Sequence, residues 1–182
     1  SRGLGDVYKR QQIHNAIERH FTDLEVDMEE TVELPSGSHP MSTFLYPIIN
    51  WSQSNKVNFT ANELKIVCPQ QGYAGTLDGA ATTMHGRATI DFKTTRTKEG
   101  EKVKPYPEQI LQLAAYHMAH YGDIRTSDTA CNVYISTTEP GRVECHWYDY
   151  QEMLSAYNAF LSICAVWRYQ KKFDPRVKVV NA

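Results

Sequence analysis

Three consecutive segments with alternating residue patterns constrain the fold of this chain more than any other feature. We expect strands over residues 61–67, 73–83 and 87–95, joined by short turns. Successive side chains of a strand point to opposite faces, so Asp91 and Lys93 share one face of the expected sheet. The other, apolar face is expected to hold Tyr73, Leu77, Ile90 and Phe92.

The turns between these strands suggest how the strands pair. A four-residue turn before the third strand places Asp78 opposite Lys93, with Asp91 as the diagonal neighbour of Asp78. The preceding turn places Glu63 opposite Asp78. One polar face would then hold three carboxylates and one ammonium group, and a slip by one residue would bury the carboxylates at a high cost.

Clustered carboxylates of this kind have a clear chemical use. Like charges repel unless a cation lies between them, and hard oxygen ligands select Mg²⁺ or Mn²⁺. Such an ion polarises a phosphate and lowers the pKa of a bound water, while Lys93 would orient the water and offset charge in the transition state. An acid-x-Lys tripeptide alone is weak support, because Glu63-Leu64-Lys65 is another one and surface strands often carry opposite charges.

The rest of the chain alternates helical and extended patterns. The expected helices cover about 6–24, 44–51 (with Pro47 inside), 107–121 and 150–171, and the expected hairpin covers 130–137 and 142–148. Residues 35–40 read as a turn-rich connector. This order predicts an α/β or α+β fold, in which helices flank a mixed central β-sheet.

The length of 182 residues suits one domain, which we place at 12–173, followed by a loose tail at 174–182. Residues 1–11 resemble a translated adaptor sequence, so we treat them as a candidate non-native leader and expect no chemistry from them.

Composition excludes several classes of protein. The net charge of −2 rules out a strongly basic coat protein, although a local basic strip could still bind nucleic acid. We find no apolar run long enough to span a bilayer and no secretory signal, so we expect no membrane partner and a cytoplasmic location. The four cysteines are far apart and form no CxxC pair, which argues against a zinc finger or an iron–sulfur cluster.

Three short motifs resemble those of a known family. Gly75-Thr76-Leu77-Asp78, Asp91-Phe92-Lys93 and Gln112-Leu113-Ala114-Ala115-Tyr116 look like the motifs of the PD-(D/E)XK nuclease superfamily. They are most similar to its RecB-type exonuclease branch, which includes the mitochondrial genome maintenance exonuclease and phage homologues. The resemblance covers about residues 10–172 and implies a restriction-endonuclease-like core.

The resemblance also implies a metal centre. Asp78 and Asp91 match the metal-binding acids, and Lys93 matches the catalytic lysine. The backbone carbonyl of Phe92 takes the place of a further metal ligand, and His14 matches the helical histidine that ligates metal in this branch. The chain departs from the branch at Arg10, where a glycine is common. The clustered cysteines of the iron–sulfur members are absent too, so we expect no iron–sulfur cluster. The expected cofactor is the Mg²⁺ or Mn²⁺ that the carboxylates would select.

Supporting roles follow from the same match. Gln112 and Tyr116 correspond to a motif that supports the site and contacts the DNA strand, and their spacing of four puts them on one helical face. Glu63 matches an acid often found one strand before the metal aspartate. For each of these residues, and for His14, an ordinary structural role is the alternative.

A basic strip follows the lysine strand directly. Thr95, Arg96 and Lys98 are candidate DNA contacts, and Lys102 and Lys104 continue the strip. Two aromatic residues, Tyr106 and Trp51, could stack on unpaired bases, although burial is the commoner outcome for aromatics. A solvated loop is the alternative reading of the strip.

Together these features predict a metal-dependent DNA exonuclease that hydrolyses phosphodiester bonds at single-stranded or duplex ends. By analogy we expect a phage or viral role in recombination or genome processing, in the host cytoplasm. Two alternatives stay open: a non-catalytic nucleic-acid-binding module of the same fold, and a metal hydrolase of small phosphate esters.

Overall fold

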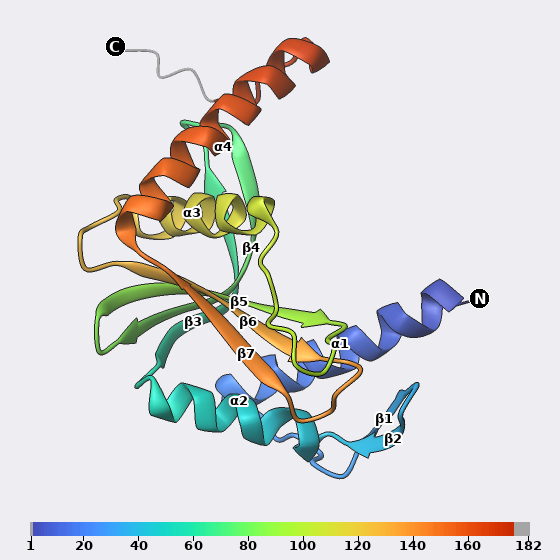
Figure 1. The fold of residues 1–182 in the computed structure, drawn as a ribbon. Helices are drawn as coiled ribbons and strands as arrows, with labels where there is room; N and C mark the ends of the chain where they lie inside the picture. The colour runs from blue at the N-terminus through green and yellow to red at the C-terminus, as the bar shows by residue number, and fades with distance from the viewer. Residues whose placement is uncertain (1, 177–182) are drawn as a thin grey trace.

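The computed structural model describes residues 2–176, and within them helices flank a five-stranded mixed sheet (Figure 1). The strand order is β3-β4-β5-β6-β7, and every neighbouring pair is antiparallel except β5 and β6. The strands are β3 Asn58–Cys68, β4 Tyr73–Thr83, β5 Gly86–Thr95, β6 Thr129–Ser136 and β7 Val143–Tyr148. The predicted fold class, a mixed central sheet flanked by helices, is confirmed.

The helices form a layer on each side of the sheet (Figure 1). α1 Arg2–Phe21 and α2 Ser42–Ser54 pack against one face, which presents Ile90 and Phe92 of β5. α3 Pro107–Tyr121 and α4 Tyr150–Lys171 cover the other face. In the described residues no helix is both long and apolar enough to cross a membrane.

Local sequence explains where α3 and α4 begin and end. Pro107 opens α3, where its missing N–H costs nothing, and Gly122 ends the helix with a left-handed φ of 80°. Asp149 caps α4 by accepting a hydrogen bond from the backbone N–H of Glu152. Both helices have the predicted bounds.

The connector predicted at 35–40 is wrong in part. β1 Thr31–Leu34 and β2 Gly37–Pro40 form a small antiparallel hairpin, with the turn centred on Pro35 and Ser36. Gly37 has a φ of 121°, which favours glycine and lets the chain reverse here. The buried side chains of Val32 and Leu34 anchor the hairpin to the α1–α2 side of the core.

The predicted pairing of β4 and β5 is wrong by two residues. Thr83 pairs with Gly86, so the turn contains only Met84 and His85, and Asp78 does not lie opposite Lys93. Gly86, the residue directly after the turn, has a φ of 137°, a conformation that favours glycine. The pairing of β3 with β4 is as predicted, because Leu64 lies opposite Leu77.

The predicted apolar face is also wrong, because its four members divide between the two faces. The Tyr73 hydroxyl donates to the carbonyl of Ala115 in α3 at 2.9 Å, and Leu77 packs with apolar residues of α3. Ile90 and Phe92 instead pack toward α1 and α2. Strict alternation fails within β4: Leu77 and Ala80, three residues apart, both pack on the α3 side, whereas Ala81 packs on the α1–α2 side.

α1 continues through residues 2–11, so the candidate leader is helical in the structure, and its foreign origin stays a prediction. The predicted domain limits likewise stay predictions. Most of the predicted tail, residues 177–182, lies outside the described residues.

Candidate active site

The candidate site lies where β4 and β5 separate. Their pairing runs from Thr83 to Gly79 on β4 and from Gly86 to Ile90 on β5. Beyond this point the backbone N–H of Phe92 donates to the Asp78 carboxylate, with 2.9 Å between Phe92 N and Asp78 Oδ2. The side chain of Asp78 therefore binds the neighbouring strand where the backbone ladder has ended.

Asp91 is buried next to this opening, with an exposed fraction of only 2%. Its Oδ1 accepts a hydrogen bond from Lys93 Nζ at 2.8 Å, and its Oδ2 accepts one from Asn132 Nδ2 at 2.9 Å. Burial raises the pKa of Asp91, and the charge of Asp78 raises it further, while Lys93 opposes both effects. Burial also raises the pKa of Asp78. The two carboxylates are short of positive charge, so a cation would stabilise their ionised forms.

His14 reaches the same place from α1. It lines a small cavity together with Glu18, Glu63 and Asp78. Burial lowers the pKa of His14, although the charge of Asp91 acts in the opposite direction. The neutral imidazole that results is the form able to ligate a metal ion.

Glu63 lies opposite Asp78 in an irregular part of β3. Its neighbours Asn62 and Leu64 pair with Gly79 and Leu77, and Glu63 itself has a left-handed φ of 45°. Such a backbone conformation is unusual for a residue with a branched or long side chain and often occurs at functional sites. The side chain is exposed beside the cavity that Asp78 lines.

Gln112 and Tyr116 connect α3 to the site. Gln112 Oε1 lies 3.5 Å from Lys93 Nζ, and Gln112 Nε2 donates to the Tyr116 hydroxyl at 3.0 Å. The Tyr116 ring lies over Gly75, where an added Cβ would come within 2.6 Å of it. Glycine at position 75 thus makes room for Tyr116, and this contact links two of the motifs quoted above.

The basic strip begins at the open side of Lys93. A cavity of about 450 Å³ is lined by Lys93, Thr95, Arg96, Lys104 and Tyr106, among others, and an adjoining cavity of about 590 Å³ includes Lys98 and Lys102. Tyr106 is 66% exposed and free to stack on a base, whereas Trp51 is buried in the core. The suggested stacking role of Trp51 is therefore wrong, because its ring packs against Phe92 and Trp147.

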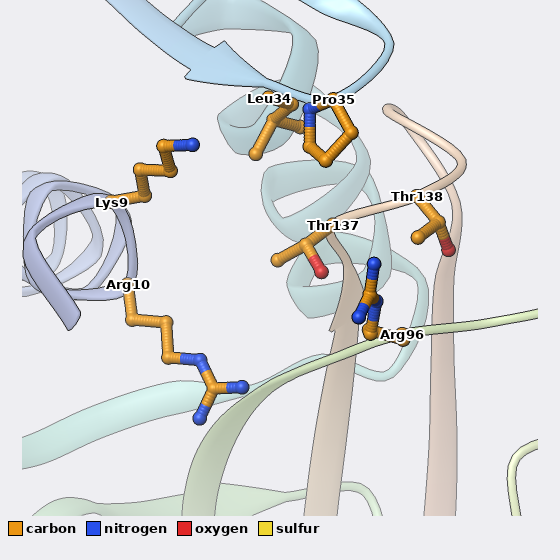
Figure 2. Close-up of a pocket in the computed structure, with 7 residues that line it drawn as sticks. All are labelled: Lys9, Arg10, Leu34, Pro35, Arg96, Thr137 and Thr138. Atoms are coloured by element: carbon orange, nitrogen blue, oxygen red, sulfur yellow. The ribbon is translucent and has the colours of Figure 1, made fainter. Parts of the chain in front are cut away.

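A smaller pocket lies between α1, the end of β5 and the β6–β7 turn. Figure 2 shows Lys9 and Arg10 on one side of it, and Arg96, Thr137 and Thr138 on the other. Lys9 and Arg10 belong to the candidate leader, so we assign this pocket no function.

Sequence reasoning missed two buried residues beside the acids. Asn132 lies next to Asp91 on the parallel strand β6 and is fully buried, and the Tyr148 hydroxyl donates to its Oδ1 at 3.0 Å. Asn132 fixes the orientation of the Asp91 carboxylate. The available signal was Asn132, a polar residue within a largely apolar strand. The sequence does not show that β6 pairs with β5 in parallel, and only this pairing places Asn132 beside Asp91.

The side chains of the candidate site can be compared with those that usually hold a metal ion. Over the described part of the chain, no three His, Cys, Asp or Glu side chains are grouped so that they could hold one. Mg²⁺ sites that act on phosphates commonly use one or two carboxylates and complete the shell with water and substrate oxygens. Asp78 and Asp91 supply that number, so the residues fit a shared ion of this kind.

The similarity of this chain to known proteins is weak. No model of a known protein family matches the chain, and no curated protein matches it significantly. A solved structure of SSO0001 is 15% identical over 68% of this chain, with a TM-score of 0.34, and the chain spans 59% of the length of SSO0001. The crystal structure of an alkaline exonuclease from Laribacter hongkongensis is 18% identical over 89% of this chain and 83% of the exonuclease, with a TM-score of 0.42. These likenesses are too weak to assign a function.

Proposed function

We propose that the protein is a metal-dependent nuclease that hydrolyses phosphodiester bonds in DNA, acting at single-stranded or duplex ends. The observation that carries the proposal is the meeting of Asp78 and Asp91 at a strand opening, with Lys93 bonded to Asp91. Buried carboxylates with raised pKa values are costly unless a cation neutralises them, so their presence beside a basic cavity favours a functional role.

Asp78 and Asp91 would hold Mg²⁺ or Mn²⁺, with His14 and the Phe92 carbonyl as the further ligands that the family resemblance implies. When bound, the ion would polarise a phosphate oxygen and lower the pKa of a bound water. This ligand set is an expectation from the sequence, supported by the position of His14 beside both acids.

Lys93 provides the positive charge of the site. Its side chain is about one-third exposed, so it can contact both Asp91 and a phosphate in the adjoining cavity. There it would stabilise the negative charge that develops on the phosphate oxygens. Gln112 lies close enough to Lys93 to orient it, and Asn132 holds Asp91 in place.

The basic cavity beside Lys93 favours a polyanionic substrate over a small phosphate ester. Arg96 and Lys104 extend the positive surface away from the acids, which a mononucleotide would not require. Action in phage or viral recombination, in the cytoplasm of a host, is part of the same proposal and rests on the family resemblance.

The test compares the native chain with Lys93→Ala on end-labelled single-stranded and duplex DNA in Mn²⁺. We expect Lys93→Ala to lower the cleavage rate at least ~100-fold, because one preorganised charge contact is worth about that much. Lys65→Ala is the matched control, since Lys65 occupies the other acid-x-Lys tripeptide and is exposed on β3.

Equal cleavage by the native chain and Lys93→Ala would reject the site. DNA binding without cleavage by the native chain would favour the non-catalytic module. Hydrolysis of nucleotides without cleavage of oligonucleotides would favour the small-ester hydrolase.

A further inference from the structure

Arg142, in the turn between β6 and β7, holds a loop that it does not belong to. The basic loop, residues 96–104, follows β5 and carries Arg96, Lys98, Lys102 and Lys104. Arg142 Nη1 donates to the carbonyl of Lys98 at 3.0 Å, and Arg142 Nη2 donates to the carbonyl of Glu101. One guanidinium group thereby fixes the backbone of the loop at two points.

Two carboxylates fix the guanidinium group in turn. Arg142 Nη1 donates to Glu139 at 2.5 Å, and Arg142 Nε donates to Glu144 at 2.9 Å. Glu144 also accepts a hydrogen bond from the backbone N–H of Val103 at 3.0 Å, which secures the far end of the loop. Arg142 is only about one-quarter exposed, so water competes weakly for its donors.

The near end of the basic loop is tied to the same turn. The backbone N–H of Thr97 donates to Thr138 Oγ1 at 2.9 Å, and that hydroxyl donates to the carbonyl of Thr97 at 2.8 Å. The Thr97 hydroxyl also donates to Glu139. The loop is therefore held along its length by the β6–β7 turn, although its lysines point into solvent.

An aromatic residue, Tyr106, lies two residues beyond the end of the basic loop. Gln109 accepts a hydrogen bond from the backbone N–H of Tyr106 at 3.1 Å and also one from the Tyr134 hydroxyl. The Tyr106 ring stays exposed at the rim of the 450 Å³ cavity that contains Lys93, Arg96 and Lys104. No acidic side chain is among the described residues that line this cavity.

We propose that Arg142 is a positioning residue that preforms the basic loop and Tyr106 into a cradle for single-stranded nucleic acid. The inference deepens the proposed function and rests on it, because it names the surface that takes the strand. The cations would contact phosphates, and Tyr106 would stack on an unpaired base, which a base-paired duplex does not offer. Arginine suits the task because its planar fork can serve two carbonyls and two carboxylates together.

The experiment measures binding without cleavage. Fluorescence anisotropy with a labelled oligothymidylate, in EDTA, would compare the native chain with Arg142→Met and Arg142→Lys. Arg125→Met is the matched control: like Arg142→Met, it removes an arginine that is paired with an acidic side chain, here Asp123. Arg125 precedes β6 and so lies at the opposite end of the parallel β5–β6 pair from the basic loop.

We expect Arg142→Met to weaken binding about fivefold or more, because a loosened loop must be ordered again when the strand binds. Arg142→Lys should restore only part of the affinity, and Arg125→Met should change it less than twofold. Hydrogen exchange at the amides of residues 97 and 103 should become faster in Arg142→Met alone.

Equal affinities for Arg142→Met and Arg125→Met would overturn the inference, and so would faster exchange in the loop without any loss of binding. If the native chain does not bind the oligonucleotide at all, the cradle is wrong. Cleavage by the native chain in Mn²⁺ would in that case still support the proposed function, so the two failures can be told apart.

Discussion

Two groups of buried charges lie at the two ends of β5, and they differ in how completely their carboxylates are neutralised. At the start of β5, Arg87 forms a bidentate ion pair with Asp128, at 3.0 and 2.5 Å. His117 bridges Asp128 and Thr89, at 3.0 and 2.8 Å. At the end of β5, the candidate active site has two buried or half-buried aspartates and one lysine.

The first group is the Asp128 cluster and the second is the candidate active site. The pKa values of their carboxylates are shifted in opposite directions. The pKa of Asp128 is lowered, because hydrogen bonds from Arg87, His117 and the backbone of Arg125 outweigh burial. The pKa values of Asp78 and Asp91 are raised, because burial outweighs their bonds. A carboxylate that serves the fold is fully paired, whereas carboxylates left short of positive charge are available to a cation.

Substitution of Asp128 gives the largest expected effect. Asp128→Asn should lower the free energy of unfolding by about 3–5 kcal/mol, because it leaves Arg87 without its buried partner. Urea denaturation checks this, with Asp123→Asn as the control at an exposed partner of the same arginine. If Asp128→Asn lowers the free energy of unfolding by less than ~1 kcal/mol, the ion pair of Asp128 does not stabilise the fold, and the proposed contrast with the candidate active site is wrong.

Acid should destabilise the protein through the Asp128 cluster. Burial lowers the pKa of His117 to about 4, below its ordinary value of 6.5. The folded state therefore favours neutral His117, and this contribution is present above pH 6.5 and lost as the pH falls toward 4. We expect the free energy of unfolding to decrease by at most about 3 kcal/mol, a figure that already includes the attraction of the charged imidazole to Asp128.

The metal-free candidate active site should respond to acid in the opposite sense. A carboxylate whose folded-state pKa is raised adds stability at low pH and loses that contribution as the pH rises through the raised value. The free energy of unfolding of the native chain and of His117→Gln, measured between pH 4 and 8 in EDTA, separates the contribution of His117 from that of the candidate-site carboxylates. His117→Gln should lose the acid sensitivity, and an unchanged pH profile would refute the assignment to His117.

Substitution of Asp78 gives the smallest expected effect. It should stabilise the protein, whereas Asp128→Asn should destabilise it. Asp78→Asn should raise the free energy of unfolding by about 1 kcal/mol at pH 7.5 without divalent ions, because it removes a charge that burial disfavours. The amide oxygen can still accept the hydrogen bond from Phe92 N–H. Destabilisation by Asp78→Asn in urea would show that Asp78 serves the fold as Asp128 does.

The sequence predicts most of the elements that build these two groups. The limits of β4, α3 and α4 are as predicted, and those of α3 are marked in the sequence by Pro107 and Gly122. The two-residue turn before Gly86 was missed, since the sequence permits a four-residue turn equally well.

The contacts that complete the candidate site could not be predicted in the same way. Asn132 becomes a partner of Asp91 only through the parallel pairing of β5 and β6, which no local pattern encodes. The division of Leu77 and Ile90 between the two faces depends on a break in the alternation of β4 between Leu77 and Ala80, which no sequence pattern marks. Alternation describes regular strands, and the site forms where the strands are not regular.

The central claim is that Asp78 and Asp91 share a divalent cation, and calorimetric titration of the metal-free protein with Mn²⁺ tests it most directly. The native chain and the exposed-site control Asp123→Asn should bind Mn²⁺ with the same affinity, and Asp78→Asn and Asp91→Asn should each bind it at least about tenfold more weakly. Equal Mn²⁺ affinity in all four proteins, or no binding by the native chain, would contradict the account.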